Sequence, residues 1–197
     1  MNDVGYVLLA GGEGRRMGGR NKLTVPYGNS TFGEIIKDEM KVTGRKCFLS
    51  VANYGCDSFD DFSVVNDSVR DDNGGYIGPL GGIYSTLTEA SNMGLKGVCT
   101  VSCDMPFFNI KIFEALEKYS DNYDIITIRT KDGHVHYTCG YYSVSVIPVL
   151  VAMINDGNYR IRDAYAKCNT VILDSEKLNL KEEWFRNINS AEDYEKI

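Results

Sequence analysis

A glycine-rich, basic segment follows the first apolar run of the chain. Five of the nine residues from 11 to 19 are glycine, and four Arg or Lys side chains fall within residues 15–22. Glycines let backbone N–H groups approach a ligand closely, and successive N–H groups form a nest that binds anions. Residues 13–22 carry a net charge of +3 on a chain whose total is −6. This local positive charge indicates that the segment binds a compact polyanion such as a triphosphate. The alternative is that the segment is a solvated loop without a ligand.

A carboxylate ends a second apolar run. Asp104 follows residues 97–103 and precedes Met105 and Pro106. In parallel α/β sheets, ligands bind beyond the carboxyl ends of the strands, so we expect Asp104 to lie at the same edge as the glycine-rich segment. Mg²⁺ often takes only one or two carboxylates and completes its shell with water and phosphate oxygens. Asp104 is therefore a candidate magnesium ligand, and the alternative is a cap for a helix near residue 110.

Two common phosphate-binding templates do not fit the glycine-rich segment. The P-loop pattern requires Ser or Thr after its lysine, but Leu23 follows Lys22. The dinucleotide pattern G-x-G-x-x-G fits Gly12 and Gly14, but Met17 stands where its third glycine belongs. An oxidoreductase on a Rossmann-like sheet is therefore a weakened alternative.

Several segments together resemble one family. Residues 9–22 (LAGGEGRRMGGRNK) are similar to the signature loop of the molybdenum cofactor guanylyltransferases, which share the nucleotide-diphospho-sugar-transferase-like fold. Asp67 with residues 77–82 (IGPLGG), residues 103–106 (CDMP), 157–163 and 185–193 resemble its other motifs. Two positions depart from the family. Val51 stands where an Asn is frequent, and Tyr137 follows His136 where Pro is usual.

The resemblance implies roles for individual residues. The implied catalytic residues are Arg16, Lys22 and Asp104, and Asp104 is the implied metal ligand. The implied nucleotide-binding residues are Leu9, Ala10, Gly11, Gly12, Gly14, Arg15, Lys22, Asn53, Asp67 and Asp104. The implied acceptor-binding residues are Gly78, Pro79, Leu80, Gly81, Gly82, Arg160, Arg162, Asn187 and Asn189.

The resemblance also implies a reaction, in which GMP moves from GTP to the terminal phosphate of molybdopterin or Mo-molybdopterin. Pyrophosphate leaves and Mg²⁺ is the cofactor. The implied protein partners are molybdenum-cofactor insertion proteins and molybdoenzyme chaperones. The alternatives are a related transferase that uses CTP or a pterin, sugar-phosphate or cobinamide-type acceptor, and a non-catalytic nucleotide-binding module. Binding assays that compare GTP with CTP, ATP and UTP separate the bases.

Length and composition set the class of protein. The 197 residues are 43% hydrophobic and 24% charged, which is typical of one soluble globular domain over residues 1–197. The net negative charge disfavours nucleic acid as a partner. The amino-terminal residues lack a basic region and a long apolar run, so we expect a cytoplasmic protein without a membrane span. The cysteines form no CxxC pair, and we expect reduced, mostly buried thiols.

The sequence pattern predicts alternating strands and helices, which position the residues discussed above. The pattern predicts strands at 4–10, 46–52, 63–66, 97–103, 123–129, 138–143 and 170–173. It predicts helices at 31–43, 80–93, 110–119 and 144–155, and a short one from 190. Strands that alternate with helices of this length indicate a three-layer α/β/α fold around a mostly parallel, Rossmann-like sheet.

Overall fold

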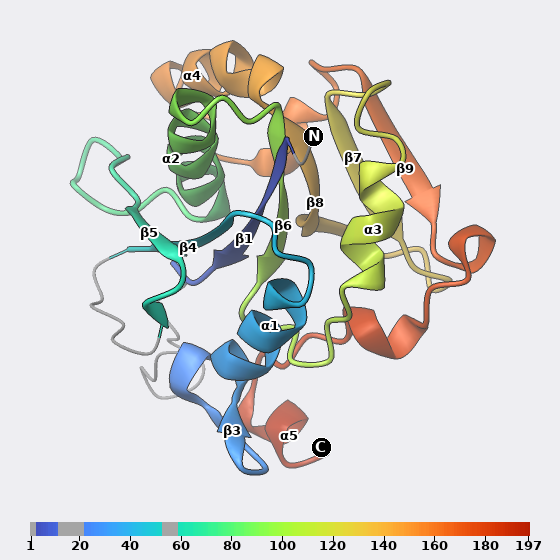
Figure 1. Ribbon diagram of the computed structural model, residues 1–197. Coiled ribbons are helices and arrows are strands. Elements are labelled where there is room, and N and C mark those ends of the chain that lie inside the picture. Colours follow the sequence, from blue (N-terminus) through green and yellow to red (C-terminus); the bar gives the residue numbers. More distant parts are fainter. Residues whose placement is uncertain (1–2, 12–21, 53–58) are drawn as a thin grey trace.

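A seven-stranded sheet forms the centre of the molecule in the computed structural model, which describes residues 3–11, 22–52 and 59–197 (Figure 1). The strand order is β5-β4-β1-β6-β8-β7-β9. The strands are β1 (Val4–Leu9), β4 (Cys47–Val51), β5 (Ser63–Asn66), β6 (Gly97–Ser102), β7 (Ile125–Arg129), β8 (Val135–Ser143) and β9 (Thr170–Asp174). The helices are α1 (Phe32–Lys41), α2 (Pro79–Asn92), α3 (Lys111–Glu117), α4 (Ile147–Asn155) and α5 (Ala191–Tyr194). A small hairpin pairs β2 (Pro26–Tyr27) with β3 (Ser30–Thr31).

The sheet is mostly parallel, as predicted. β1 pairs in parallel with β4 on one side and with β6 on the other, whereas β8 runs antiparallel to both β6 and β7. The chain extends the sheet from β1 to β4 and β5 and then crosses back through α2 to β6. This reversal makes β1 and β6 the switch point, where ligands of such sheets bind beyond the carboxyl ends of the strands.

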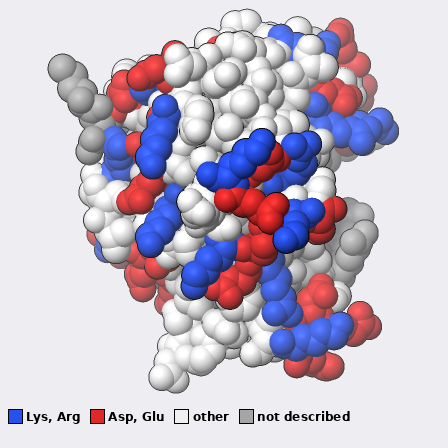
Figure 2. Space-filling model, turned by 90° about the vertical axis from the view of Figure 1, so that its right-hand side faces the viewer, with Lys and Arg blue, Asp and Glu red and all other residues white. Residues whose placement is uncertain are grey.

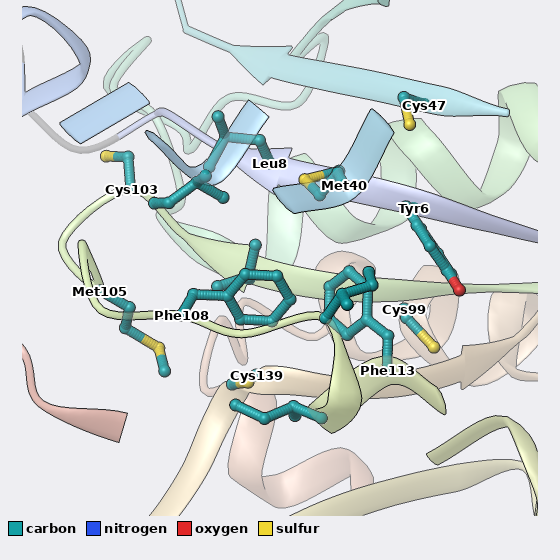
Figure 3. Packing of buried hydrophobic residues seen from close by; sticks show 14 of the residues in the cluster. Tyr6, Leu8, Met40, Cys47, Cys99, Cys103, Met105, Phe108, Phe113 and Cys139 are labelled. Carbon is teal, nitrogen blue, oxygen red and sulfur yellow. The ribbon is translucent and has the colours of Figure 1, made fainter. Parts of the chain in front are cut away.

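Alternating side chains of the strands feed two apolar layers. Tyr6 and Leu8 of β1 point into the layer covered by α1 and α3, and Val7 and Leu9 point into the layer covered by α2 and α4. Figure 3 shows the first layer, in which the rings of Tyr6 and Phe113 lie 4.8 Å apart. The two layers complete the α/β/α arrangement that the pattern predicts.

Buried thiols form part of this core. Cys47, Cys99, Cys103 and Cys139 are buried and free (Figure 3), as predicted. Burial raises the pKa of Cys103 to about 12, because the apolar surroundings disfavour a thiolate. These side chains therefore act as small hydrophobic groups.

The turn that presents Lys22 is packed against α1. Thr31 caps this helix: its side chain accepts from the Glu34 backbone N–H, and the Glu34 carboxylate accepts from the Thr31 backbone N–H. A Cβ atom at Gly33 would lie 2.9 Å from the Leu23 carbonyl oxygen. Only glycine therefore lets the 3₁₀ turn Lys22–Thr24 pack this closely on the helix.

The C-terminal segment crosses the carboxyl edge of the sheet and joins two loops. Its Ile188 backbone N–H donates to the Asp104 carbonyl at 2.8 Å, and the Ile188 side chain is fully buried. The Tyr194 hydroxyl donates to the Pro26 carbonyl at 2.8 Å, which places α5 beside the β2–β3 hairpin (Figure 1). The short helix predicted from residue 190 is α5, which a capping box from Ser190 to Asp193 starts.

Positive and negative side chains are interspersed on the face that includes the β9 edge (Figure 2). Arg129 and Lys177 both pair with Asp174, and Lys131 pairs with Glu176. This face lacks the single-sign field that binds a nucleic-acid backbone. Of the described helices, none is both long and apolar enough to span a bilayer.

Candidate active site

A cavity of about 240 Å³ opens at the switch point of the sheet. The sequence-predicted site residues in its wall are Leu9, Gly11, Lys22, Asp67, Gly78, Pro79, Gly82 and Asp104. The wall also contains Ser50, Ser102, Cys103 and Thr138, which sequence reasoning did not assign to the site. The ends of β1, β4 and β6 thus meet segments that lie far apart along the chain.

Lys22 and Asp104 meet in this cavity. The Lys22 Nζ atom lies 3.3 Å from the Asp104 Oδ2 atom and donates to the Asn189 Oδ1 atom at 2.8 Å. The side chains of Lys22 and Asp104 are each 15% exposed, so their ion pair is only partly screened by water. One cation therefore joins the loop after β6 to the C-terminal segment.

Among the residues that the structure describes, two oxygen atoms near this ion pair have no hydrogen-bond partner. They are the Oδ1 atoms of Asp104 and Asn187, and both are buried. Buried polar atoms are nearly always satisfied, so these two neighbouring acceptors are open to a bound water molecule or ligand group. Carboxylate and amide oxygens suit a hard divalent cation. Within the described residues no group of three or more His, Cys, Asp and Glu side chains gathers to form a protein-only metal site.

The amino terminus of α2 faces the cavity through glycines. Gly78 precedes the helix with a φ of 76°, a conformation that favours glycine. A Cβ atom at Gly81 would lie 2.6 Å from the Asp67 Oδ2 atom, and one at Gly82 would lie 2.6 Å from the Ser50 Oγ atom. The glycines thus let the helix approach two polar side chains of the wall, and its N-terminal N–H groups add positive potential there.

Asp67 is buried at the end of β5. Its Oδ1 atom accepts from the Val69 backbone N–H at 3.0 Å, and its own backbone N–H donates to the Val51 carbonyl. Burial raises the pKa of this carboxyl, and the hydrogen bond from Val69 and the charge of Arg70 oppose the rise. The Arg70 guanidinium stacks 3.6 Å from the centre of the Tyr76 ring and holds the loop between Asp67 and α2 closed.

A second cavity, of about 670 Å³, lies beside the first. Asn187 and Asn189 line it, together with His136 and Phe185. The His136 Nε2 atom lies 3.1 Å from the Thr130 hydroxyl, and burial lowers the pKa of this imidazole to about 4, so the ring is neutral near pH 7. Asn189 also contacts Lys22 and thereby connects the two cavities.

A bulge in β8 aims side chains at both cavities. Thr127 of β7 pairs with Gly140, but Arg129 pairs with Val135, so β8 has extra residues between these pairs. His136 lies against the Phe185 ring on one side, whereas the next residue, Tyr137, lies against Tyr165. Thr138 then reaches the first cavity. Bulges re-aim side chains in this way beside functional sites.

Several predicted residues lie elsewhere. Leu80 of α2 is fully buried in the core, and Ala10 is buried with its N–H bonded to the Ser50 carbonyl. Arg160 and Arg162 are exposed on the segment before β9 and are absent from the walls of both cavities. Gly12, Gly14, Arg15, Arg16 and Asn53 lie outside the described residues.

Of the residues that sequence reasoning missed, Ser50, Ser102 and Cys103 lie at the carboxyl ends of β4 and β6, and Thr138 lies within β8. Ser50 and Ser102 both stand opposite Leu9 in the parallel registers. A signal for Ser50 exists, because it is a polar residue within the apolar run 46–52. Thr138 has no local signal, since its place depends on the antiparallel direction of β8.

The fold and the site together define a nucleotidyltransferase with the architecture of the nucleotide-diphospho-sugar transferases. The family model of the MobA-like NTP transferase domain matches residues 6–171, and the chain belongs to this family.

Related proteins agree with this assignment. A probable molybdenum cofactor guanylyltransferase from Carboxydothermus hydrogenoformans is 30% identical over 200 residues, covering 100% of this chain and 96% of the relative. The crystal structure of molybdopterin-guanine dinucleotide biosynthesis protein A from Archaeoglobus fulgidus has a TM-score of 0.79 at 20% identity, covering 98% of this chain and 96% of that one. A manganese complex of Rv0371C from Mycobacterium tuberculosis has a TM-score of 0.65 at 17% identity, covering 98% and 97%.

Proposed function

We propose that this enzyme transfers GMP from GTP to the terminal phosphate of molybdopterin, with or without bound molybdenum, and releases pyrophosphate. The observation that carries the proposal is the contact between Lys22 and Asp104 in a cavity at the switch point. The curated relative named above supports guanine as the base and the pterin as the acceptor.

Lys22 and the glycine-rich segment hold the triphosphate in this proposal. The Lys22 ammonium faces the cavity beside Gly11, and Arg15, Arg16, Gly12 and Gly14 continue the segment along the chain. Ammonium and backbone N–H groups offset the negative charge that develops on the leaving pyrophosphate.

Asp104 holds the divalent metal ion, proposed to be Mg²⁺. The fit rests on chemistry that the described residues show: the buried, unpartnered Oδ1 atom of Asp104 is a hard oxygen ligand, and the Oδ1 atom of Asn187 is a second free acceptor. A bound Mg²⁺ supplies charge neutralisation for the phosphates.

The two cavities divide the substrates. Asp67, Gly78, Pro79 and Gly82 border the first cavity, where we place the nucleotide, with Asp67 at its base or ribose. The resemblance implies an acceptor role for the two glycines and Pro79, but their place in the same wall as Asp67 favours the nucleotide. Asn187 and Asn189 border the second cavity, where we place the acceptor. Lys22 stands between them, so the α-phosphate of GTP and the acceptor phosphate meet beside its ammonium.

The chemistry needs positioning more than acid–base catalysis. An oxygen of the acceptor phosphate attacks the α-phosphorus, the bond from that phosphorus to the α,β-bridging oxygen breaks, and pyrophosphate leaves with the electron pair. The attacking oxygen is already an anion, so no side chain has to remove a proton. The residues of the two cavities hold two polyanions in line against their mutual repulsion.

Pyrophosphate release tests the proposal. We expect release with GTP, molybdopterin and Mg²⁺, and little with CTP. Asp104→Asn is expected to lower kcat/KM by a factor of about 100 or more, in the range for a lost electrostatic contact in the transition state. Asp121→Asn is the matched control, since Asp121 pairs with Lys96 near the opposite end of β6. Equal release with CTP contradicts the guanine assignment, and an unaffected Asp104→Asn enzyme contradicts the site.

A further inference from the structure

Lys22 contacts the same carboxylate that we assign to the metal ion. Its Nζ atom lies 3.3 Å from the Asp104 Oδ2 atom. We propose that the Lys22 ammonium and the divalent metal ion compete for the charge of Asp104, and that the ammonium moves to the triphosphate when metal and nucleotide bind together. The proposal rests on the proposed function and adds an order to it: the metal binds weakly without nucleotide.

Burial makes this competition strong. Both side chains are only 15% exposed, so the field of the ammonium at Asp104 is screened less than at the surface. Within the described part of the chain, no second Lys or Arg forms an ion pair with Asp104. Lys22 is therefore the counter-ion of this carboxylate among the described residues, and its charge repels an incoming divalent ion.

Asn189 stations the ammonium beside Asp104. Its Oδ1 atom accepts from the Lys22 Nζ atom at 2.8 Å. The backbone of Asn189 is fixed in turn, because its N–H and that of Ser190 donate to the Asp193 carboxylate at the start of α5. The amide is neutral, so it holds the ammonium by one hydrogen bond and without a second ion pair.

The lysine can change partner without movement of the backbone. A lysine side chain carries its point charge on a flexible four-carbon stem. Lys22 lies in the wall of the first cavity. A triphosphate bound there would carry more negative charge than one carboxylate and would attract the ammonium more strongly. Transfer of the ammonium to the phosphates frees Asp104 for the metal, so each ligand increases the affinity for the other.

Binding of Mn²⁺ in the absence of nucleotide tests the competition. The free ion is measured by electron paramagnetic resonance against wild type, Lys22→Met, Lys22→Gln and Lys22→Arg. We expect the two uncharged variants to bind Mn²⁺ at least about tenfold more tightly than wild type, since an adjacent positive charge is removed from a partly buried site. Lys22→Arg keeps the charge and is expected to bind like wild type.

Two controls separate this proposal from the proposed function. Lys177→Met changes the net charge equally at an exposed position and is expected to leave Mn²⁺ affinity within about twofold of wild type, because exposed charges are screened. Asp104→Asn is expected to abolish the tight site in the Lys22→Met background. If Asp104→Asn has no effect, the metal assignment itself is wrong. If Asp104 matters but the uncharged Lys22 variants bind no more tightly than wild type, the competition is wrong and the metal assignment stands.

Discussion

Replacement of Gly81 with alanine is expected to damage both stability and nucleotide binding. The new Cβ atom would lie 2.6 and 2.8 Å from the two carboxylate oxygens of Asp67 and 2.9 Å from the Ile77 Cγ1 atom. Asp67 cannot rotate away freely, because its Oδ1 atom accepts from the Val69 backbone N–H and its own N–H is bonded to Val51. The substitution therefore displaces either the carboxylate or the start of α2.

The expected change in the free energy of unfolding combines two destabilising contributions and one stabilising contribution. Overpacking a buried site costs about 1–3 kcal/mol, and a weakened hydrogen bond to a charged acceptor adds about 1 kcal/mol. The better helix propensity of alanine returns about 1 kcal/mol. We expect a net loss of about 2 kcal/mol in the free energy of unfolding, or a fall in Tm of roughly 4–8 °C for a chain of this length.

Urea unfolding and calorimetric titration with GTP measure the two effects. We expect GTP affinity to fall about tenfold, since one displaced hydrogen bond to a charged group is worth about 1.4 kcal/mol or more. Gly82→Ala is the matched control for stability, because among the described residues its Cβ atom would approach closely only the rotatable Ser50 hydroxyl. A Gly81→Ala protein as stable as wild type, with unchanged GTP affinity, would refute the packing argument.

Three further predictions concern pH and a remote ion pair. Burial lowers the pKa of His136 to about 4, so the free energy of unfolding decreases as the pH falls from about 6.5 toward 4. In urea titrations, we expect wild type to lose about 2 kcal/mol more than His136→Gln between pH 7 and 4.5. Equal losses in the two proteins would contradict the burial argument. Burial raises the pKa of the Asp67 carboxyl, so ionisation of Asp67 destabilises the folded wild type as the pH rises above about 4. We therefore expect Asp67→Asn to become more stable relative to wild type over this range. A difference in unfolding free energy that does not change with pH would contradict the raised pKa. Glu117 accepts from the Tyr6 hydroxyl at 2.6 Å and pairs with Arg45, remote from the active site. We expect Glu117→Ala to lower the free energy of unfolding by about 2 kcal/mol and to leave kcat unchanged. A changed kcat would contradict the separation of this ion pair from the active site.

Elements with local signals were predicted closely. The helix expected at 31–43 is α1, which starts with a capping box of Thr31 and Glu34. The helix expected at 80–93 is α2, which starts with Gly78 and Pro79. These signals involve residues within one helical turn, so the sequence alone exposes them. The β2–β3 hairpin was not predicted, because strands of two residues have no periodicity to detect.

Non-local pairing limited the prediction of the site. Lys22 and Asp104 could be placed at one sheet edge because each follows an apolar run that ends in turn residues. The direction of β8 is absent from its local pattern, so Thr138 was not expected at the same edge. The Lys22–Asn189 hydrogen bond joins residues 167 positions apart, and no spacing rule reaches that far.

A crystal structure with GTP and Mn²⁺, with the metal located by its anomalous scattering, tests the central claim most directly. We predict the metal within about 2.5 Å of an Asp104 carboxylate oxygen, the triphosphate on Lys22 and the glycine-rich segment, and the base on the side of Asp67. A metal remote from Asp104, or a triphosphate that contacts neither Lys22 nor Gly11, would contradict the account.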